Sequence, residues 1–88
     1  MKKLNVTVKS KSGLHARPAA TLVNLTQQFE SNITIEKDGR SANAKSIIGI
    51  LSIGAARGDM VSVLIDGEDE TEAFNELEEL FNKTLPNE

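Results

Sequence analysis

Residues 33–44 read ITIEKDGRSANA, and this segment decides which kind of sheet the chain can form. Its two isoleucines alternate with polar residues, which is typical of a strand that buries one face. The dipeptide Asp38-Gly39 follows, and it is a strong signal for a two-residue turn between antiparallel strands. Residues 41–44 are expected to form the short returning strand. The segment therefore predicts a β-hairpin with an apolar face that other elements must cover.

The flanking sequence supplies two more strands and three helices. Apolar and polar residues alternate again in residues 4–8 and 61–65, which predicts one strand before the hairpin and one after it. Helices are expected over residues 16–28, residues 47–53 and residues 70–85. The order βαββαβα predicts an open-faced α/β sandwich, in which helices cover one face of a sheet. At 88 residues the chain is expected to form a single domain, residues 1–88.

Particular residues mark the ends of these helices. Small polar side chains accept hydrogen bonds from the first amides of a helix, and glycine adopts the left-handed conformation that often ends one. The expected end residues are His15 and Ser46 as N-caps, Pro18 in a first turn, Gly54 as a stop, and Asp69 with Glu72 as a capping box.

The composition excludes several classes of protein. The chain has no cysteine and a single histidine, which excludes a disulfide framework and a clustered zinc site, so no metal is expected. No apolar run reaches the roughly 18–20 residues of a membrane span. Polar residues at positions 5, 7 and 9 interrupt any signal-peptide core. The absence of Trp and Tyr and a net charge of −3 argue against nucleic acid as a partner. We expect a cytoplasmic protein without a cofactor.

Charge is distributed unevenly along the chain. Residues 1–29 contain five basic residues and no acidic one, whereas residues 59–88 contain ten acidic residues and one basic one. His15 therefore lies in the basic part. Such polarity attracts anionic groups or acidic partner surfaces, although charge blocks of this kind also occur on surfaces that bind nothing.

The only histidine lies in the run GLHARP, residues 13–18, where a loop is expected to become a helix. The first N–H groups of a helix have no partner within it, and with the positive end of the helix dipole they bind anions. A neutral imidazole nitrogen is a nucleophile near neutral pH. The run therefore predicts a phosphoryl acceptor, with His15 as nucleophile, Arg17 as a stabilising cation, and the amides of Ala16 and Arg17 as a phosphate cradle.

The short helix after Ser46 carries a second signal. At roughly 100° per residue, its apolar residues fall into two clusters. The clusters are Ile47, Ile48 and Leu51 on one side, and Ile50 and Ile53 on the other. Two helical turns cannot bury both clusters against one sheet face. We expect the cluster of Ile47, Ile48 and Leu51 to stay exposed near His15 as a docking patch, unless the loop at residues 10–13 covers it.

Both motifs, residues 13–18 (GLHARP) and residues 45–49 (KSIIG), stand at the spacing found in the HPr family. The chain resembles this family over essentially its whole length. HPr proteins are the histidine-containing phosphocarriers of the bacterial sugar phosphotransferase system. The resemblance implies a four-stranded antiparallel sheet with its strands in the spatial order first, fourth, second, third, and three helices on one face.

The resemblance also implies a function. His15 would take a phosphoryl group from phosphorylated enzyme I and pass it to sugar-specific A-type transporter domains. In Gram-positive bacteria, an HPr kinase/phosphorylase would modify Ser46, and the seryl-phosphorylated form would bind a catabolite-control transcription factor. We expect a monomer.

Two alternatives remain open. A sister group of HPr-like proteins is purely regulatory and lacks the active-site histidine, and residues 36–40 and 43–46 are similar to that group. The presence of His15 favours the carrier. The other alternative is a small binding domain in which Arg17 is a surface residue and Ser46 only a cap worth about 1 kcal/mol. No nucleotide loop and no set of nucleophile, base and orienting group occurs, so an enzyme with its own catalytic site is not expected.

Overall fold

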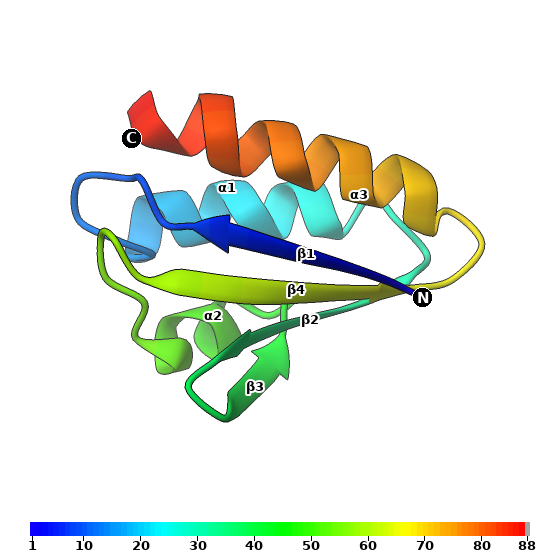
Figure 1. The fold of residues 1–88 in the computed structure, drawn as a ribbon, viewed down its shortest axis with the longest axis horizontal. Coiled ribbons are helices and arrows are strands. Elements are labelled where there is room, and N and C mark those ends of the chain that lie inside the picture. Colours follow the sequence, from blue (N-terminus) through cyan, green and yellow to red (C-terminus); the bar gives the residue numbers. More distant parts are fainter. Residues whose placement is uncertain (88) are drawn as a thin grey trace.

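The computed structural model describes residues 1–87, and its elements follow the predicted order βαββαβα (Figure 1). The strands are β1 (Lys2–Thr7), β2 (Asn32–Lys37), β3 (Arg40–Asn43) and β4 (Met60–Asp66). The α-helices are α1 (Ala16–Thr26), α2 (Ile47–Ile53) and α3 (Glu70–Glu79). A π-helical turn (Leu80–Thr84) and a 3₁₀ turn (Leu85–Asn87) continue α3. Within residues 1–87 no helix is long and apolar enough to cross a bilayer.

The four strands form one antiparallel sheet in the order β1-β4-β2-β3. The register places Leu4, Val63 and Ile35 in one row across three neighbouring strands. The three helices pack on one face of this sheet, and the other face is open (Figure 1). The fold is therefore the open-faced sandwich that the sequence predicts, with the strand order that the resemblance implies.

The alternation within each strand decides which side chains are buried. The residues that face the helices form one core, to which the sheet contributes Leu4, Val6, Ile33, Ile35, Val61, Val63 and Ile65. The intervening residues lie on the open face, where the Ser62 hydroxyl donates to the Asn5 side chain at 2.7 Å. Alternation of period two is thus sufficient to orient the sheet.

The predicted turn and the predicted helix ends are largely confirmed. Asp38 and Gly39 both have positive φ, +50° and +81°, as a two-residue hairpin turn requires. The first helix ends at Thr26 rather than at residue 28. The amides of Gln28 and Phe29 bond to carbonyls three residues earlier, so the chain tightens into 3₁₀-type turns there.

The predicted capping box at the start of α3 is wrong. Asp69 does occupy the N-cap position, but within the described chain its side chain makes no cap hydrogen bond and Glu72 does not complete a box. The Asp69 carboxylate instead accepts the backbone N–H groups of Glu30 and Ser31, at 2.8 and 3.0 Å, and the Ser31 hydroxyl. These donors hold the pKa of Asp69 below its ordinary value, the Ser31 hydroxyl most strongly. Tertiary contact with the turn between α1 and β2 therefore replaces the local cap.

Candidate functional site

His15 is the residue from which α1 begins. Its backbone is extended (φ −85°, ψ −169°) and its carbonyl accepts the Ala19 N–H at 2.8 Å, so it is the N-cap residue, as predicted. Pro18 lies in the first turn, where its missing N–H removes no helical bond. Among the described residues the imidazole has no capping partner, and the side chain is exposed. It is thus accessible to another molecule.

The first turn of α1 presents backbone amides to solvent. In the part of the chain that the structure describes, the N–H groups of Ala16 and Arg17 donate to no acceptor, and both residues are exposed. The turn contains no acidic side chain that would neutralise the positive end of the helix. Such an arrangement can bind an anion such as a phosphoryl group.

Arg17 adds a full positive charge two residues after His15. Its guanidinium is exposed, and it enters none of the ion pairs found within residues 1–87. The Thr21 hydroxyl donates to the Arg17 carbonyl at 3.1 Å, one turn further along the helix. The cation is therefore available for charged hydrogen bonds to phosphate oxygens.

The loop that carries His15 is fixed from two sides. The buried Ser10 hydroxyl donates to the Gly13 carbonyl at 2.7 Å. The N–H of the buried Leu14 donates at 2.9 Å to the carbonyl of Ala55, just after α2. Gly13 has φ +74°, and a Cβ at this position would lie 2.5 Å from the Ala55 oxygen. Only glycine fits such a close approach in that conformation.

Ser46 is the N-cap of α2, as predicted. Its hydroxyl oxygen accepts the Gly49 N–H at 3.1 Å, and the side chain is half-buried. The helix ends at Gly54, which is left-handed with φ +70°. A phosphate on Ser46 would place its negative charge at the amino end of α2, where the helix dipole favours an anion.

One of the two apolar clusters of α2 is buried and the other is exposed. Ile50 and Ile53 are buried, with 0% and 3% of their surface exposed. Ile47, Ile48 and Leu51, which we call the α2 patch, are 40%, 77% and 42% exposed. The loop at residues 10–13 does not cover them. Exposure of large apolar side chains is a property of docking surfaces.

The structure places the α2 patch between His15 and Ser46. Ala55, after the end of α2, bonds to the loop before His15. At the other end of α2, the Gln27 side chain donates to the Lys45 carbonyl at 3.3 Å, so Ser46 lies beside the carboxyl end of α1. Because α1 has 11 residues, its two ends are about 16 Å apart. The helix thus lies beside the His15 loop as expected, but Ser46 is at its far end.

Asp59 and Lys37, which the sequence patterns do not single out, stabilise the loop between α2 and β4. Asp59 accepts the Ala56 N–H at 2.8 Å, and its carboxylate lies 3.4 Å from the Lys37 ammonium. These contacts hold the pKa of Asp59 below its ordinary value, the Ala56 N–H most strongly. The sequence indicates only a loop at residues 57–59, because Lys37 is distant in the chain and no local motif links it to Asp59.

Comparison with known proteins identifies the family. The family model described as "PTS HPr component phosphorylation site" matches residues 2–83. The phosphocarrier protein HPr of Xylella fastidiosa is 49% identical over 76 residues, which are 86% of this chain and 85% of that protein. The chain belongs to the HPr family. The HPr-like protein Crh of Bacillus subtilis is 46% identical over 72 residues, 82% of this chain and 85% of that protein.

The fold agrees with solved HPr structures. HPr-C-His from Thermoanaerobacter tengcongensis has a TM-score of 0.93 to this chain at 43% identity, covering 100% of this chain and 98% of that one. HPr proteins are phosphocarriers of the phosphotransferase system, and Crh relates the family to catabolite repression. The family model is described by a phosphorylation site, and His15 is the single histidine of the chain.

Proposed function

We propose that this chain carries a phosphoryl group on His15, taking it from phosphorylated enzyme I and passing it to sugar-specific A-type transporter domains. One observation supports this most: an exposed imidazole, two unpaired helix amides and an unpaired guanidinium occur within residues 15–17 of the described chain. These donors are in position before the group arrives, so they can stabilise its charge with little rearrangement.

In each transfer, one bond to phosphorus forms at His15 while another breaks. A neutral imidazole nitrogen of His15 attacks phosphorus with its lone pair, and a nitrogen–phosphorus bond forms. The bond from phosphorus to the donor breaks, and its electron pair leaves with the donor. The proton on the other ring nitrogen stays in place. The phosphoryl oxygens then face the amides of Ala16 and Arg17 and the Arg17 guanidinium, and attack by an acceptor reverses the sequence.

The α2 patch provides the docking surface in this proposal. Ile47, Ile48 and Leu51 lie on the helix whose carboxyl end is tied to the loop before His15. A carrier must bind two kinds of partner in turn and release each of them. A small apolar surface supplemented by basic side chains suits brief complexes with acidic partners.

The chain acts as a carrier rather than as an enzyme. Its HPr relatives are phosphocarrier proteins, and His15 has no neighbouring base and orienting group in the sequence. Enzyme I and the transporter domains would supply the rest of the catalytic machinery. We place the protein in the cytoplasm as a monomer and assign it no cofactor.

A regulatory role of Ser46 forms the second part of the proposal. The chain is 46% identical to Crh of Bacillus subtilis over 72 residues, and Ser46 is a half-buried cap at the edge of the α2 patch. Phosphorylation by an HPr kinase/phosphorylase would put a negative charge beside the docking surface. The seryl-phosphorylated form would bind a catabolite-control transcription factor. A purely regulatory protein would use Ser46 alone and leave His15 unused.

The decisive test is to replace the acceptor. His15→Ala should fold like the parent, because the exposed imidazole makes no bond within the described structure that the fold needs. Incubated with enzyme I and phosphoenolpyruvate, it should gain no acid-labile phosphate, whereas Ser46→Ala should be labelled normally. Normal labelling of His15→Ala would disprove the carrier function.

The regulatory part is tested by mimicking the seryl phosphate. Ser46→Asp should melt at a similar or slightly higher temperature, because a carboxylate favours the amino end of α2. Its KM with enzyme I should rise, and more so at low salt, because the charge weakens the attraction of an acidic partner. Steady-state kinetics at two ionic strengths measure this. An unchanged KM at low ionic strength would mean that Ser46 is only a helix cap.

A further inference from the structure

The loop between α2 and β4 lies next to the loop between β1 and α1 (Figure 1). The carboxylate of Asp59 closes the first of these loops. Asp59 Oδ2 accepts the Ala56 N–H at 2.8 Å, and the Asp59 N–H donates to the Ala56 carbonyl at 3.0 Å. These two bonds fold residues 56–59 into a turn. The turn follows directly on Ala55, whose carbonyl receives the Leu14 N–H.

The same turn also holds the other end of the His15 loop. The Val8 N–H donates to the Asp59 carbonyl and the Gly58 N–H donates to the Val8 carbonyl, both at 2.8 Å. Both ends of the segment from Val8 to Leu14 are therefore bonded to residues 55–59. Gly13 in turn packs directly on Ala55 and Ala56, with no room for a Cβ between them. A displacement of that turn is therefore expected to shift the loop from which α1 begins.

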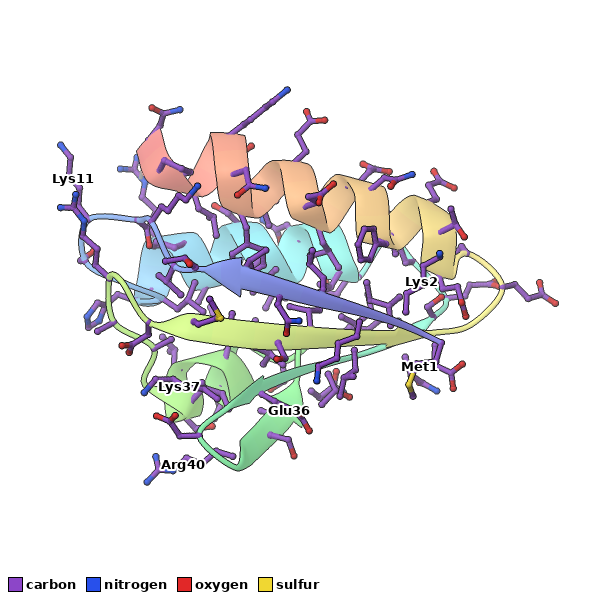
Figure 2. The ribbon with its side chains drawn as sticks, viewed as in Figure 1. Met1, Lys2, Lys11, Glu36, Lys37 and Arg40 are labelled. Carbon is purple, nitrogen blue, oxygen red and sulfur yellow. The ribbon has the colours of Figure 1, made fainter. Side chains whose placement is uncertain are left out.

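Lys37, the last residue of β2, contacts the Asp59 carboxylate from a third part of the chain. Its ammonium lies 3.4 Å from Asp59 Oδ2 and 3.4 Å from Asp38 Oδ2, and its side chain is 20% exposed. Figure 2 shows Lys37 at the same end of the molecule as Lys11, with Met1 at the other end. Asp59 holds the pKa of Lys37 above its ordinary value, mainly through the hydrogen bond between the two side chains.

We propose that Asp59, supported by Lys37, is a positioning residue for His15. By closing the turn over residues 56–59 it fixes the Ala55 carbonyl, and this carbonyl sets where α1 begins and how its unpaired amides are oriented. The kinetic consequence rests on the proposed phosphocarrier function, whereas the structural consequence does not.

Positioning of His15 and docking of the partner should affect different kinetic constants. The α2 patch contacts the partner in our proposal, so its loss should raise KM. Asp59 acts on the orientation of the acceptor after docking, so its loss should lower kcat and leave KM unchanged. Misplacing a reacting group by about 1 Å can cost roughly a hundredfold in rate.

The experiment compares four variants with enzyme I and phosphoenolpyruvate. Asp59→Ala removes the turn closure and should lower kcat by roughly tenfold, within the range expected for a small misplacement. Asp59→Asn removes the ion pair with Lys37, and Lys37→Met removes this pair together with the contact to Asp38, so both should have smaller effects in the same direction. Lys37→Arg keeps a cation at this position and should keep the parental kcat. Hydrogen exchange of the Leu14 N–H, measured by NMR, should be faster in Asp59→Ala.

Asp69→Ala is the matched control. Asp69 also accepts backbone N–H groups through its carboxylate, but it holds the turn at Glu30 and Ser31, away from His15. This variant should lose stability and keep both the parental kcat and the parental exchange rate at Leu14. Equal losses of kcat in Asp69→Ala and Asp59→Ala would show that stability alone sets the rate and would overturn the proposal.

Different results would contradict the carrier function and the positioning role of Asp59. If the parent accepts no phosphate from enzyme I, the carrier function fails, and exchange at the Leu14 N–H still decides whether Asp59 positions the loop. If the parent is labelled and Asp59→Ala has the parental kcat and exchange rate, the positioning role alone is wrong. If Asp59→Ala does not fold, Asp59→Asn and Lys37→Met decide the matter by the same measurements.

Discussion

The amino ends of α1 and α3 lie at opposite ends of the molecule (Figure 1). They differ in whether acidic groups of the chain neutralise the positive partial charge of the helix start. The first turn of α1 has no acidic residue and exposes Ala16 and Arg17. The first turn of α3 contains Glu70 and Glu72, and Glu70 lies 3.0 Å from the terminal amine of Met1. The chain neutralises the start of α3 by itself, whereas the start of α1 can bind an anion from outside.

The loops at the two ends are nevertheless built alike. Gly13 packs closely on the loop that Asp59 closes. At the other end, Gly67 packs closely on Ser31, which Asp69 holds by hydrogen bonds. A close glycine and a bonded carboxylate therefore fix a loop in both places. What distinguishes the functional end is the charge left open at the helix start, not the construction of the loop.

The largest effect is expected from Gly13→Ala. Its φ of +74° is unfavourable for alanine, and the new Cβ would lie 2.5 Å from the Ala55 oxygen, so the His15 loop must move. We expect a loss of about 2–4 kcal/mol in unfolding free energy. The phosphoryl-transfer rate should fall by roughly a hundredfold. Urea unfolding and labelling with enzyme I measure the two effects.

Gly67→Ala is the control at the other end. Its Cβ would lie 2.5 Å from the Ser31 hydroxyl oxygen and 2.6 Å from the Ser31 Cα, so this variant should also be destabilised. Its transfer rate should equal that of the parent at a temperature where both are folded. A comparable loss of rate in both variants would remove the functional distinction between the two ends.

A smaller effect is expected when the charge at the start of α1 is changed. Arg17→Ala should slow phosphoryl transfer by roughly ten- to a hundredfold, because a charged hydrogen bond to phosphate contributes about 1.5–3 kcal/mol. The melting temperature should change little, since Arg17 enters no ion pair in the described chain. Rapid-quench labelling and thermal melts measure the two quantities. Parental kinetics would contradict the role of Arg17.

Ala16→Glu sharpens the same comparison by giving α1 an acidic first turn like that of α3. The carboxylate should stabilise the fold by a few tenths to about 1 kcal/mol through the helix dipole. It should also slow transfer, because it occupies or repels the phosphate position. A variant that is both more stable and as fast as the parent would show that the free amides do not bind the phosphoryl group.

The smallest effect is expected from Asp69→Asn, and it depends on pH. The pKa of Asp69 lies below its ordinary value because the Ser31 hydroxyl and the Glu30 N–H bond to the carboxylate. A lowered folded-state pKa adds stability that is present above the ordinary pKa of about 4 and is lost as the pH falls through the folded-state value. Asp69→Asn should therefore melt a few degrees lower at neutral pH, and this difference should shrink in acid.

Thermal melts across this pH range measure the effect, and the labelling rate should stay parental throughout. A melting-temperature difference that does not change with pH would mean that the charge of Asp69 contributes nothing. A reduced labelling rate at neutral pH would connect the α3 end to the site and weaken the comparison.

Local rules account for the features that the sequence predicted correctly. The turn at Asp38-Gly39, the N-caps at His15 and Ser46, and the stop at Gly54 each depend on a few neighbouring residues. Alternation within the strands determined which face is buried. The cluster of an imidazole, free amides and a guanidinium is also local, so the candidate acceptor could be recognised from the sequence.

Only the tertiary structure determined which residues hold the loops in place and how far Ser46 lies from His15. Asp69 looks like a helix cap, yet it bonds to Glu30, 39 positions away in the chain. The pairing of Asp59 with Lys37, and the position of Ser46 away from His15, likewise depend on how separate elements pack. A carboxylate takes whichever donors the fold brings to it, and hydrogen-bonding capacity alone does not specify a partner that is distant in sequence. The packing of the helices on the sheet determines which donors lie near each carboxylate.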